Sequence, residues 1–229
     1  MQLNSGNYLQ IDELLNAQEL SAILNLINQA GFSDGKSTAS DAAAGVKQNK
    51  QISAENNFQA QQIGQIVSQA ISRNRRIQSA IFPKVILPPL VSLYEPGMHY
   101  GTHVDSPLMG TQFTIRTDVG MTLFLSPPES YEGGELEVIT EAGIKLFKPA
   151  AGSAVIYPTT RLHQVLPVTN GKRMAVVTWM QCAIRDSGQR EIIDQINQVL
   201  DQMNQTEHKE SRLVLQQVYS NLIRMWAEL

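Results

Sequence analysis

Apolar residues near the start of the chain recur three and four positions apart, which is the spacing of an amphipathic helix. Asn16 and Glu19 precede the first apolar stripe with the spacing of a capping box. A second helix is expected over residues 54–75, before a group of prolines from residue 83 onward closes the helical region. The polar stretch between the two helices, residues 31–51, is predicted to be a loop or a weak strand.

The central part of the chain has a different pattern, in which short apolar or alternating runs are separated by turns rich in glycine and proline. The runs cover residues 90–94, 121–125, 135–139, 153–157 and 174–179. Several short strands in this arrangement predict an antiparallel double sheet or a barrel-like sandwich. No glycine-rich phosphate-binding motif follows any of these strands.

Helical spacing returns in residues 184–229, with two apolar faces on either side of a polar break at residues 204–210. Two amphipathic helices joined by a short polar loop form a helical hairpin. The hairpin could pack on the rest of its own chain, form a homodimer interface or hold another partner, and the sequence leaves these alternatives open.

The chain therefore divides into three regions and belongs to the α+β class. We expect an N-terminal helical support region over residues 1–83 and a sheet domain over residues 84–183. The C-terminal helical hairpin would occupy residues 184–229.

Composition narrows the class of protein further. The chain has 229 residues, of which 42% are hydrophobic and 17% charged, with a formal net charge of -3. Its one cysteine, Cys182, excludes an internal disulfide framework and a cysteine-rich zinc module. We expect no nucleic-acid surface, because no basic patch is visible, and no membrane span, because no apolar run approaches ~20 residues. With no signal peptide apparent, the expected location is the cytoplasm.

The strongest candidate chemistry involves the four histidines. His103 and Asp105 are two residues apart, so in a strand their side chains point to the same face. His163, which follows a predicted strand, is the best candidate for a third ligand. Two histidines and one carboxylate form the open face that is diagnostic of non-haem Fe(II) oxygenases. The alternative for His103 is a strand histidine bonded to Asp105 or to the backbone.

Arg173 strengthens this interpretation. It lies ten residues after His163, across a turn at residues 169–171, and a hairpin there would bring it beside the metal. An arginine suits the far carboxylate of a 2-oxoglutarate molecule, because it grips a carboxylate through two parallel hydrogen bonds. Tyr94 could donate its phenolic O–H to the same carboxylate. The alternative for Arg173 is an exposed hairpin residue.

Three other features have less specific interpretations. Trp179 shares strand parity with Arg173 and is expected in the barrel core rather than as a substrate-stacking ring. The acidic, double-glycine segment at residues 131–135 is expected to be a hairpin turn, although its acidic groups could line a substrate entrance. His99 is expected at the rim of the site rather than among the ligands.

Together these motifs resemble the PKHD-type hydroxylases, a bacterial group of Fe(II)- and 2-oxoglutarate-dependent dioxygenases related to the prolyl 4-hydroxylase catalytic domain. The resemblance covers most of the chain. It includes residues 94–105, 116–118, 122–126, 131–136, 162–163, 167–173, 179–181, 184–186 and 221–226. The chain departs from the group at His99 and around residues 119–121, neither of which touches the candidate ligands.

The resemblance implies a double-stranded β-helix (jelly-roll) core with helices packed on it. It also implies that His103, Asp105 and His163 bind Fe(2+), that Arg173 and, less firmly, Tyr94 bind 2-oxoglutarate, and that L-ascorbate keeps the iron reduced. The expected reaction hydroxylates a C–H bond with O2 and releases succinate and CO2. The substrate, a small molecule or a peptidyl group, is unidentified.

Two rival functions use the same ligands. One is a jelly-roll module that binds or senses a metal without oxidation, although such a module has no need for Arg173 as a dicarboxylate clamp. The other is a zinc hydrolase, which would need a general base such as a glutamate beside the metal. No glutamate adjoins a histidine of the candidate site.

Overall fold

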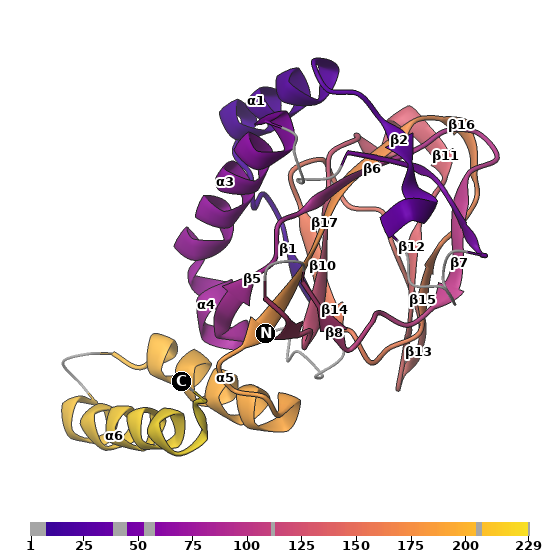
Figure 1. Ribbon diagram of the computed structural model, residues 1–229. Helices are drawn as coiled ribbons and strands as arrows, with labels where there is room; N and C mark the ends of the chain where they lie inside the picture. The colour runs from indigo at the N-terminus through magenta and orange to yellow at the C-terminus, as the bar shows by residue number, and fades with distance from the viewer. Residues whose placement is uncertain (1–7, 39–44, 53–57, 111–112, 205–207, 229) are drawn as a thin grey trace.

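The computed structural model describes residues 8–38, 45–52, 58–110, 113–204 and 208–228. Two antiparallel sheets lie face to face, and helices cover the outer side of the larger sheet (Figure 1). Within the described part of the chain, no helix is long and apolar enough to cross a membrane.

The larger sheet has eight strands in the order β1-β14-β10-β17-β6-β4-β2, with β5 paired to β17. Its strands are β1 (Leu9–Ile11), β2 (Ser33–Asp34), β4 (Lys50–Ile52), β5 (Pro83–Ile86), β6 (Leu90–Tyr94), β10 (Val119–Phe124), β14 (Ala154–Pro158) and β17 (Arg173–Cys182). The long strand β17 pairs with β10, β6 and β5, so it forms the middle of the sheet.

The smaller sheet has five strands in the order β13-β12-β15-β7-β3. They are β3 (Lys47–Gln48), β7 (His99–His103), β12 (Leu136–Thr140), β13 (Gly143–Phe147) and β15 (His163–Val165). Two further pairs join β8 (Leu108–Met109) to β9 (Ile115–Arg116), and β11 (Tyr131–Gly133) to β16 (Val168–Gly171). The facing sheets form a jelly roll, and side chains from both sheets form a small buried core: Phe124, Leu136, Val138, Phe147, Val155 and Tyr157.

Three helices cover the outer face of the larger sheet: α1 (Ala17–Asn28), α3 (Phe58–Arg73) and α4 (Arg75–Ile81) (Figure 1). The capping box of α1 is confirmed, because Asn16 Oδ1 accepts from the Glu19 N–H at 2.9 Å and Glu19 Oε2 accepts from the Asn16 N–H at 3.0 Å. The largest hydrophobic core lies between these helices and the sheet. Its members include Ile23, Ile27, Ile63, Val67, Ile71, Ile77, Met121, Leu123, Ile156, Val176 and Met180.

The structure adds to the expected N-terminal region in two ways. The helix expected over residues 54–75 is confirmed as α3, although its predicted start falls outside the described residues. A further helix, α4, follows it, because Asn74 has an extended backbone and caps α4 by accepting from the Ile77 N–H at 3.0 Å. The region also supplies β1, β2 and β4 to the larger sheet and β3 to the smaller one, so it does more than support the fold. The three-region division of the chain stays a prediction.

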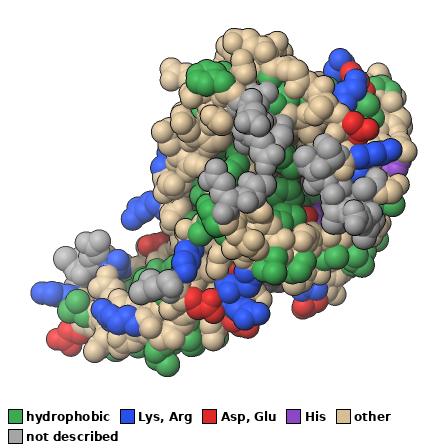
Figure 2. Space-filling model, in the orientation of Figure 1, with side chains coloured by type: hydrophobic (Ala, Val, Ile, Leu, Met, Phe, Trp, Pro, Cys, Tyr) green, Lys and Arg blue, Asp and Glu red, His purple; other side chains and the backbone are tan. Residues whose placement is uncertain are grey.

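The C-terminal helical hairpin is confirmed as α5 (Ser187–Gln202) and α6 (Lys209–Trp226). Helix α5 packs on α4, where Asp194 accepts from both terminal nitrogens of Arg76. Helix α6 packs on α5, and an ion pair between Arg116 and Glu228 ties the end of the chain to the sheet domain. Side chains of both charges gather over these two helices (Figure 2). A homodimer through the hairpin stays a prediction.

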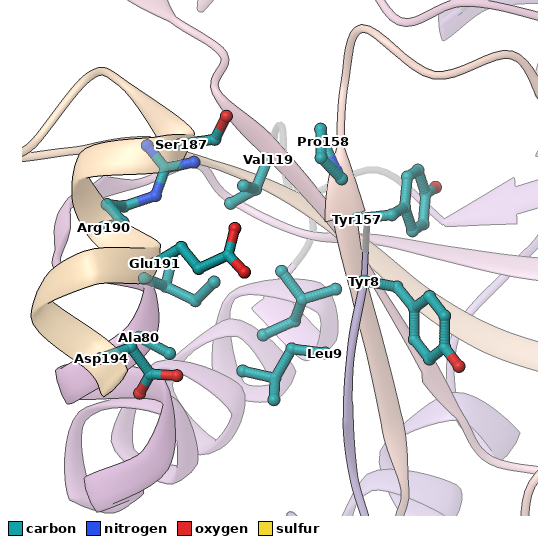
Figure 3. A pocket seen from close by; sticks show the side chains of 12 residues that line it. Tyr8, Leu9, Ala80, Val119, Tyr157, Pro158, Ser187, Arg190, Glu191 and Asp194 are labelled. Atoms are coloured by element: carbon teal, nitrogen blue, oxygen red, sulfur yellow. The ribbon is translucent and has the colours of Figure 1, made fainter. Parts of the chain in front are cut away.

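A small pocket lies between α4, α5 and the strands β1, β10 and β14 (Figure 3). Its charged side chains, Arg190, Glu191 and Asp194, come from α5. Arg190 donates to the backbone oxygens of Ile184 and Arg185 at 2.7 and 2.8 Å, which anchors the helix to the end of β17. None of the predicted site residues lines this pocket. We interpret it as a packing gap between the sheet and the C-terminal helices.

Candidate metal centre

The pairing of β7 with β15 places two histidines opposite each other. His103 and His163 are direct partners across the antiparallel ladder, and their ring centroids are 4.2 Å apart. Asp105 follows β7 by two residues, and its Oδ1 lies 3.8 Å from His163 Nε2. One ligand atom from each of the three side chains lies within 4.8 Å of the others. The structure therefore brings together the three residues that the sequence singled out, in an arrangement that could hold a metal ion.

Backbone hydrogen bonds fix the orientation of both imidazole rings. His103 Nδ1 lies 2.8 Å from the Gly101 oxygen, and His163 Nδ1 lies 3.0 Å from the Arg161 oxygen. A carbonyl oxygen can only accept, so each Nδ1 carries the proton and each Nε2 keeps a free lone pair. This is the arrangement that metal-binding histidines commonly use. A purely structural His103 was also expected to form a hydrogen bond with the backbone, and that bond is present. The same hydrogen bond leaves Nε2 of the ring available to bind a metal.

The electrostatics of the three side chains favour a bound cation. Burial, together with a smaller effect of the neighbouring His163, lowers the pKa of His103 to about 4. Burial also raises the pKa of Asp105, against the opposing effects of His163 and of the Trp179 indole. Among the described residues, Asp105 Oδ2 is buried without a hydrogen-bond partner. A divalent ion would satisfy this oxygen and offset the cost of burying the carboxylate.

Arg173 lies in the same cavity, where the larger sheet faces the histidines. It begins β17 directly opposite Tyr94 at the end of β6, and only 1% of its surface is exposed. Its guanidinium carbon is 5.1 Å from the Tyr94 ring centroid and 5.2 Å from that of Phe124. Its Nε and Nη2 have no hydrogen-bond partner among the described residues. A buried guanidinium with two unpaired donors is suited to bind a carboxylate.

Two expectations about this region were wrong. No hairpin joins residues 168–171 to Arg173, because β16 pairs with β11 while β17 pairs with β10 and β6. Arg173 is therefore placed by the centre of the larger sheet, and it is not an exposed hairpin residue. The double-glycine segment is also not a simple hairpin turn. Gly134 has a φ of 67°, and a Cβ there would lie 3.0 Å from Arg173 Cδ, so this glycine makes room for the arginine.

The cavity has a volume of about 700 Å³ including its open mouth, which suits a small organic ligand. Trp179 lines it instead of belonging only to the core, and Tyr100 stacks on His103 with 3.7 Å between ring centroids. His99 does not line it. Three further residues that line the cavity, Lys47, Gln51 and Ser92, were not singled out from the sequence. Lys47 and Gln51 lie on strands of two and three residues, which are too short to show a period.

Comparison with known proteins identifies the class. A family model described as the 2OG-Fe(II) oxygenase superfamily matches residues 89–181, which run from β6 to β17. Among solved structures, a Pseudomonas putida prolyl-4-hydroxylase matches with a TM-score of 0.55 and 19% identity, covering 79% of this chain and 95% of that one. A prolyl hydroxylase from Trichoplax adhaerens matches with a TM-score of 0.57 and 20% identity, covering 84% and 89%. These structural likenesses confirm the jelly-roll fold.

The fold, the candidate metal centre and the family match define a 2-oxoglutarate- and Fe(II)-dependent dioxygenase. A relative from Synechococcus is 44% identical over 96% of this chain and 98% of its own length. Relatives from Thermosynechococcus vestitus and Cupriavidus metallidurans are 41% and 40% identical over 96% of this chain. All three are named PKHD-type hydroxylases, and this chain belongs to that family. The expected Fe(II) and 2-oxoglutarate are confirmed as the cofactor and cosubstrate of the class, and a non-oxidative binding module is disfavoured.

Proposed function

We propose that His103, Asp105 and His163 hold Fe(II) while Arg173 binds the far carboxylate of 2-oxoglutarate, and that the enzyme hydroxylates a C–H bond. One observation supports this proposal most strongly. Arg173 is buried in the same cavity as the three ligand side chains, and its Nε and Nη2 have no hydrogen-bond partner among the described residues. A metal site alone would not need this arginine. A dicarboxylate that chelates the metal at one end needs a positively charged partner such as Arg173 for the carboxylate at its other end.

The residues fit this cofactor set chemically. Two neutral imidazoles and one carboxylate leave coordination positions open, as non-haem Fe(II) oxygenases require. When bound, iron with 2-oxoglutarate and O2 supplies the oxidising chemistry and yields succinate and CO2. The chain orients the two imidazoles through their Nδ1–H bonds and holds the cosubstrate through Arg173, in the same cavity.

Tyr94 has a supporting role in this proposal. Its ring lies against the Arg173 guanidinium, a cation–π contact that stabilises the charge in a buried position. Donation of its phenolic O–H to 2-oxoglutarate stays a prediction.

Three further parts of the proposal come from the sequence. L-Ascorbate would keep the iron reduced, as the family resemblance implies. The substrate would be a small molecule or a peptidyl group. The cytoplasm is the proposed location, because Cys182 is a free, buried thiol rather than part of a disulfide.

Anaerobic visible absorption tests the proposal without knowledge of the substrate. Fe(II) followed by 2-oxoglutarate should produce a metal-to-ligand charge-transfer band in the purified protein. His163→Ala should lose iron binding and the band. Arg173→Ala should still bind iron but need at least about tenfold more 2-oxoglutarate, because a buried charge-assisted hydrogen bond contributes about 1.5–3 kcal/mol.

Arg75→Ala is the matched control, since Arg75 is exposed and does not line the cavity. It should behave as the unsubstituted protein does. Iron binding without a band in the unsubstituted protein would reject the proposed function. Equal loss of iron and 2-oxoglutarate affinity in Arg173→Ala would reject the role of Arg173.

A further inference from the structure

Trp179 is an aromatic residue near the end of β17 whose indole N–H the proposed function does not use. It lies six residues after Arg173 on the same strand and lines the same cavity, so it faces the candidate metal centre. Its Nε1 is buried and has no hydrogen-bond partner among the described residues. Buried indole N–H groups usually have a partner, so an unpaired donor that faces a metal centre indicates a role there.

Gly120 leaves a gap on the larger sheet beside Trp179. In the ladders of this sheet, Gly120 of β10 pairs with Trp179 of β17 on one side and with Tyr157 of β14 on the other. Residues paired across strands point to the same face, so the three form a row in which the middle residue has no side chain. The two aromatic side chains, which both line the cavity, therefore flank an open space.

The Asp105 carboxylate lies in this space. A Cβ on Gly120 would be 3.2 Å from Asp105 Oδ2 and 3.3 Å from Tyr157 Cε2. The sequence suggested that residues 119–121, where the chain departs from the family resemblance, do not touch the candidate ligands. The structure corrects this expectation, because any side chain at Gly120 would crowd the carboxylate. Asp105 is thus placed against the larger sheet, although it follows β7 of the smaller one.

Trp179 and Asp105 are close enough to interact. Burial raises the pKa of Asp105, and both His163 and the indole N–H of Trp179 oppose this effect. Among the described residues, Asp105 Oδ2 and Trp179 Nε1 are nevertheless both without a hydrogen-bond partner. A buried donor and a buried acceptor that lie side by side can bond after a small rotation of the carboxylate. A metal ion that binds the carboxylate fixes this rotation.

We propose that Trp179 is a positioning residue of the metal centre, whose indole N–H donates to the Asp105 carboxylate when that carboxylate binds the metal. The inference rests on the proposed function and adds a residue beyond the three ligands. A carboxylate has about four lone-pair sites, so it can bind a metal and accept an N–H at the same time. Trp179 would then orient Asp105 as the Gly101 and Arg161 oxygens orient the two imidazoles.

NMR of the indole N–H tests the hydrogen bond directly. The chain has two tryptophans, so the indole signal that remains in Trp226→Phe belongs to Trp179. Zn(II), which is diamagnetic, takes the place of iron in this experiment. Adding it to the unsubstituted protein should move the Trp179 N–H proton signal downfield, because a hydrogen bond to a carboxylate deshields the proton. The Trp226 signal should not move, because Trp226 lies on α6 and does not line the cavity.

Zinc affinity tests what the hydrogen bond does. Competition with a coloured chelator should show that Trp179→Phe binds Zn(II) about 10–100-fold more weakly, the usual effect of removing a partner of a metal ligand. Trp226→Phe is the matched control and should bind Zn(II) as the unsubstituted protein does. In a Trp226→Phe background, β-(3-benzothienyl)alanine at position 179 keeps the ring shape and replaces the indole N–H with sulfur. This protein should lose the same factor, which separates the hydrogen bond from packing.

Three results would overturn the inference. They are a Trp179 signal that Zn(II) does not move downfield, an unchanged zinc affinity in Trp179→Phe, and an unchanged zinc affinity in the benzothienyl protein. The last would assign Trp179 to packing alone, and the benzothienyl protein decides the question if Trp179→Phe does not fold. All three leave the proposed function intact, whereas failure of the unsubstituted protein to bind Fe(II) or 2-oxoglutarate would reject it.

Discussion

At the scale of single residues, the site consists of polar groups whose burial costs free energy unless a ligand completes them. Asp105 Oδ2 and two donors of Arg173 lack partners among the described residues. An unsatisfied buried polar group costs about 1–3 kcal/mol. Buried polar groups with a purely structural role are rarely left without partners. We therefore expect Asp105 Oδ2 to bind the metal and the two Arg173 donors to bind the cosubstrate.

Gly134 provides a residue-scale prediction. Its substitution by alanine would place a Cβ 2.9 Å from Val168 Cγ2 and 3.0 Å from Arg173 Cδ, so the arginine must shift. We expect Gly134→Ala to lower 2-oxoglutarate affinity by about tenfold while iron binding is unchanged, because a displaced guanidinium loses about one charge-assisted hydrogen bond. Titration of the charge-transfer band measures both.

Gly143→Ala is its control. Gly143 also has a positive φ, of 105°, but a Cβ there would meet nothing within 4 Å. It should cost stability through backbone strain and leave 2-oxoglutarate affinity unchanged. Equal affinities in the two variants would show that Gly134 does not position Arg173.

At the scale of elements, two strand pairings assemble the site. The ladder between β7 and β15 sets His103 opposite His163, and the ladder between β17 and β6 sets Arg173 opposite Tyr94. A shift of either register by one residue would turn these side chains to the other face of the sheet. The register is thus as necessary to the site as the residues themselves.

The break between α3 and α4 gives a prediction at this scale. Asn74 caps α4 through its side chain, so Asn74→Ala should lower the free energy of unfolding by about 1 kcal/mol. Asn74→Asp, which can cap in the same way, should lose much less. Urea unfolding compares the three proteins, and equal stability of all three would mean that the cap contributes nothing.

At the scale of the whole molecule, the helices and the cavity lie on different sides of the larger sheet. Helices α1, α3 and α4 cover its outer face, and α5 and α6 extend from α4 away from β7 and β15 (Figure 1). The helical layer buries one face of the sheet and leaves the other free to face the metal centre. We expect changes in the C-terminal helices to affect stability more than cofactor binding.

Asp194→Ala tests this separation. Asp194 is buried and accepts from Arg76 and Gln198, so its loss should cost about 2 kcal/mol and speed hydrogen exchange in α5 and α6. The charge-transfer band with Fe(II) and 2-oxoglutarate should be unchanged. Asp201→Ala, at an exposed position of the same helix, is the control. A weakened band in Asp194→Ala would show that the helices are coupled to the site.

The sequence alone determined much of this protein, because several of its features are local. The capping box at Asn16, the C-terminal helical hairpin and the antiparallel strands depend on neighbouring residues and can be recognised from spacing. The grouping of His103 with Asp105 is also local, since residues two apart in a strand share a face. Their positions along the chain made His163 and Arg173 candidates for the same site, and the resemblance to a known family supported both.

Only the tertiary structure decided how distant segments meet. It placed Arg173 in the centre of the larger sheet rather than on a hairpin. It also showed that Trp179, which was expected in the barrel core, lines the cavity. It also brought Lys47 beside Tyr100 through the pairing of two short strands far apart in the chain. Such pairings depend on long-range hydrogen bonds and on packing across the sheets, and a strand as short as β3 has no periodicity to reveal them.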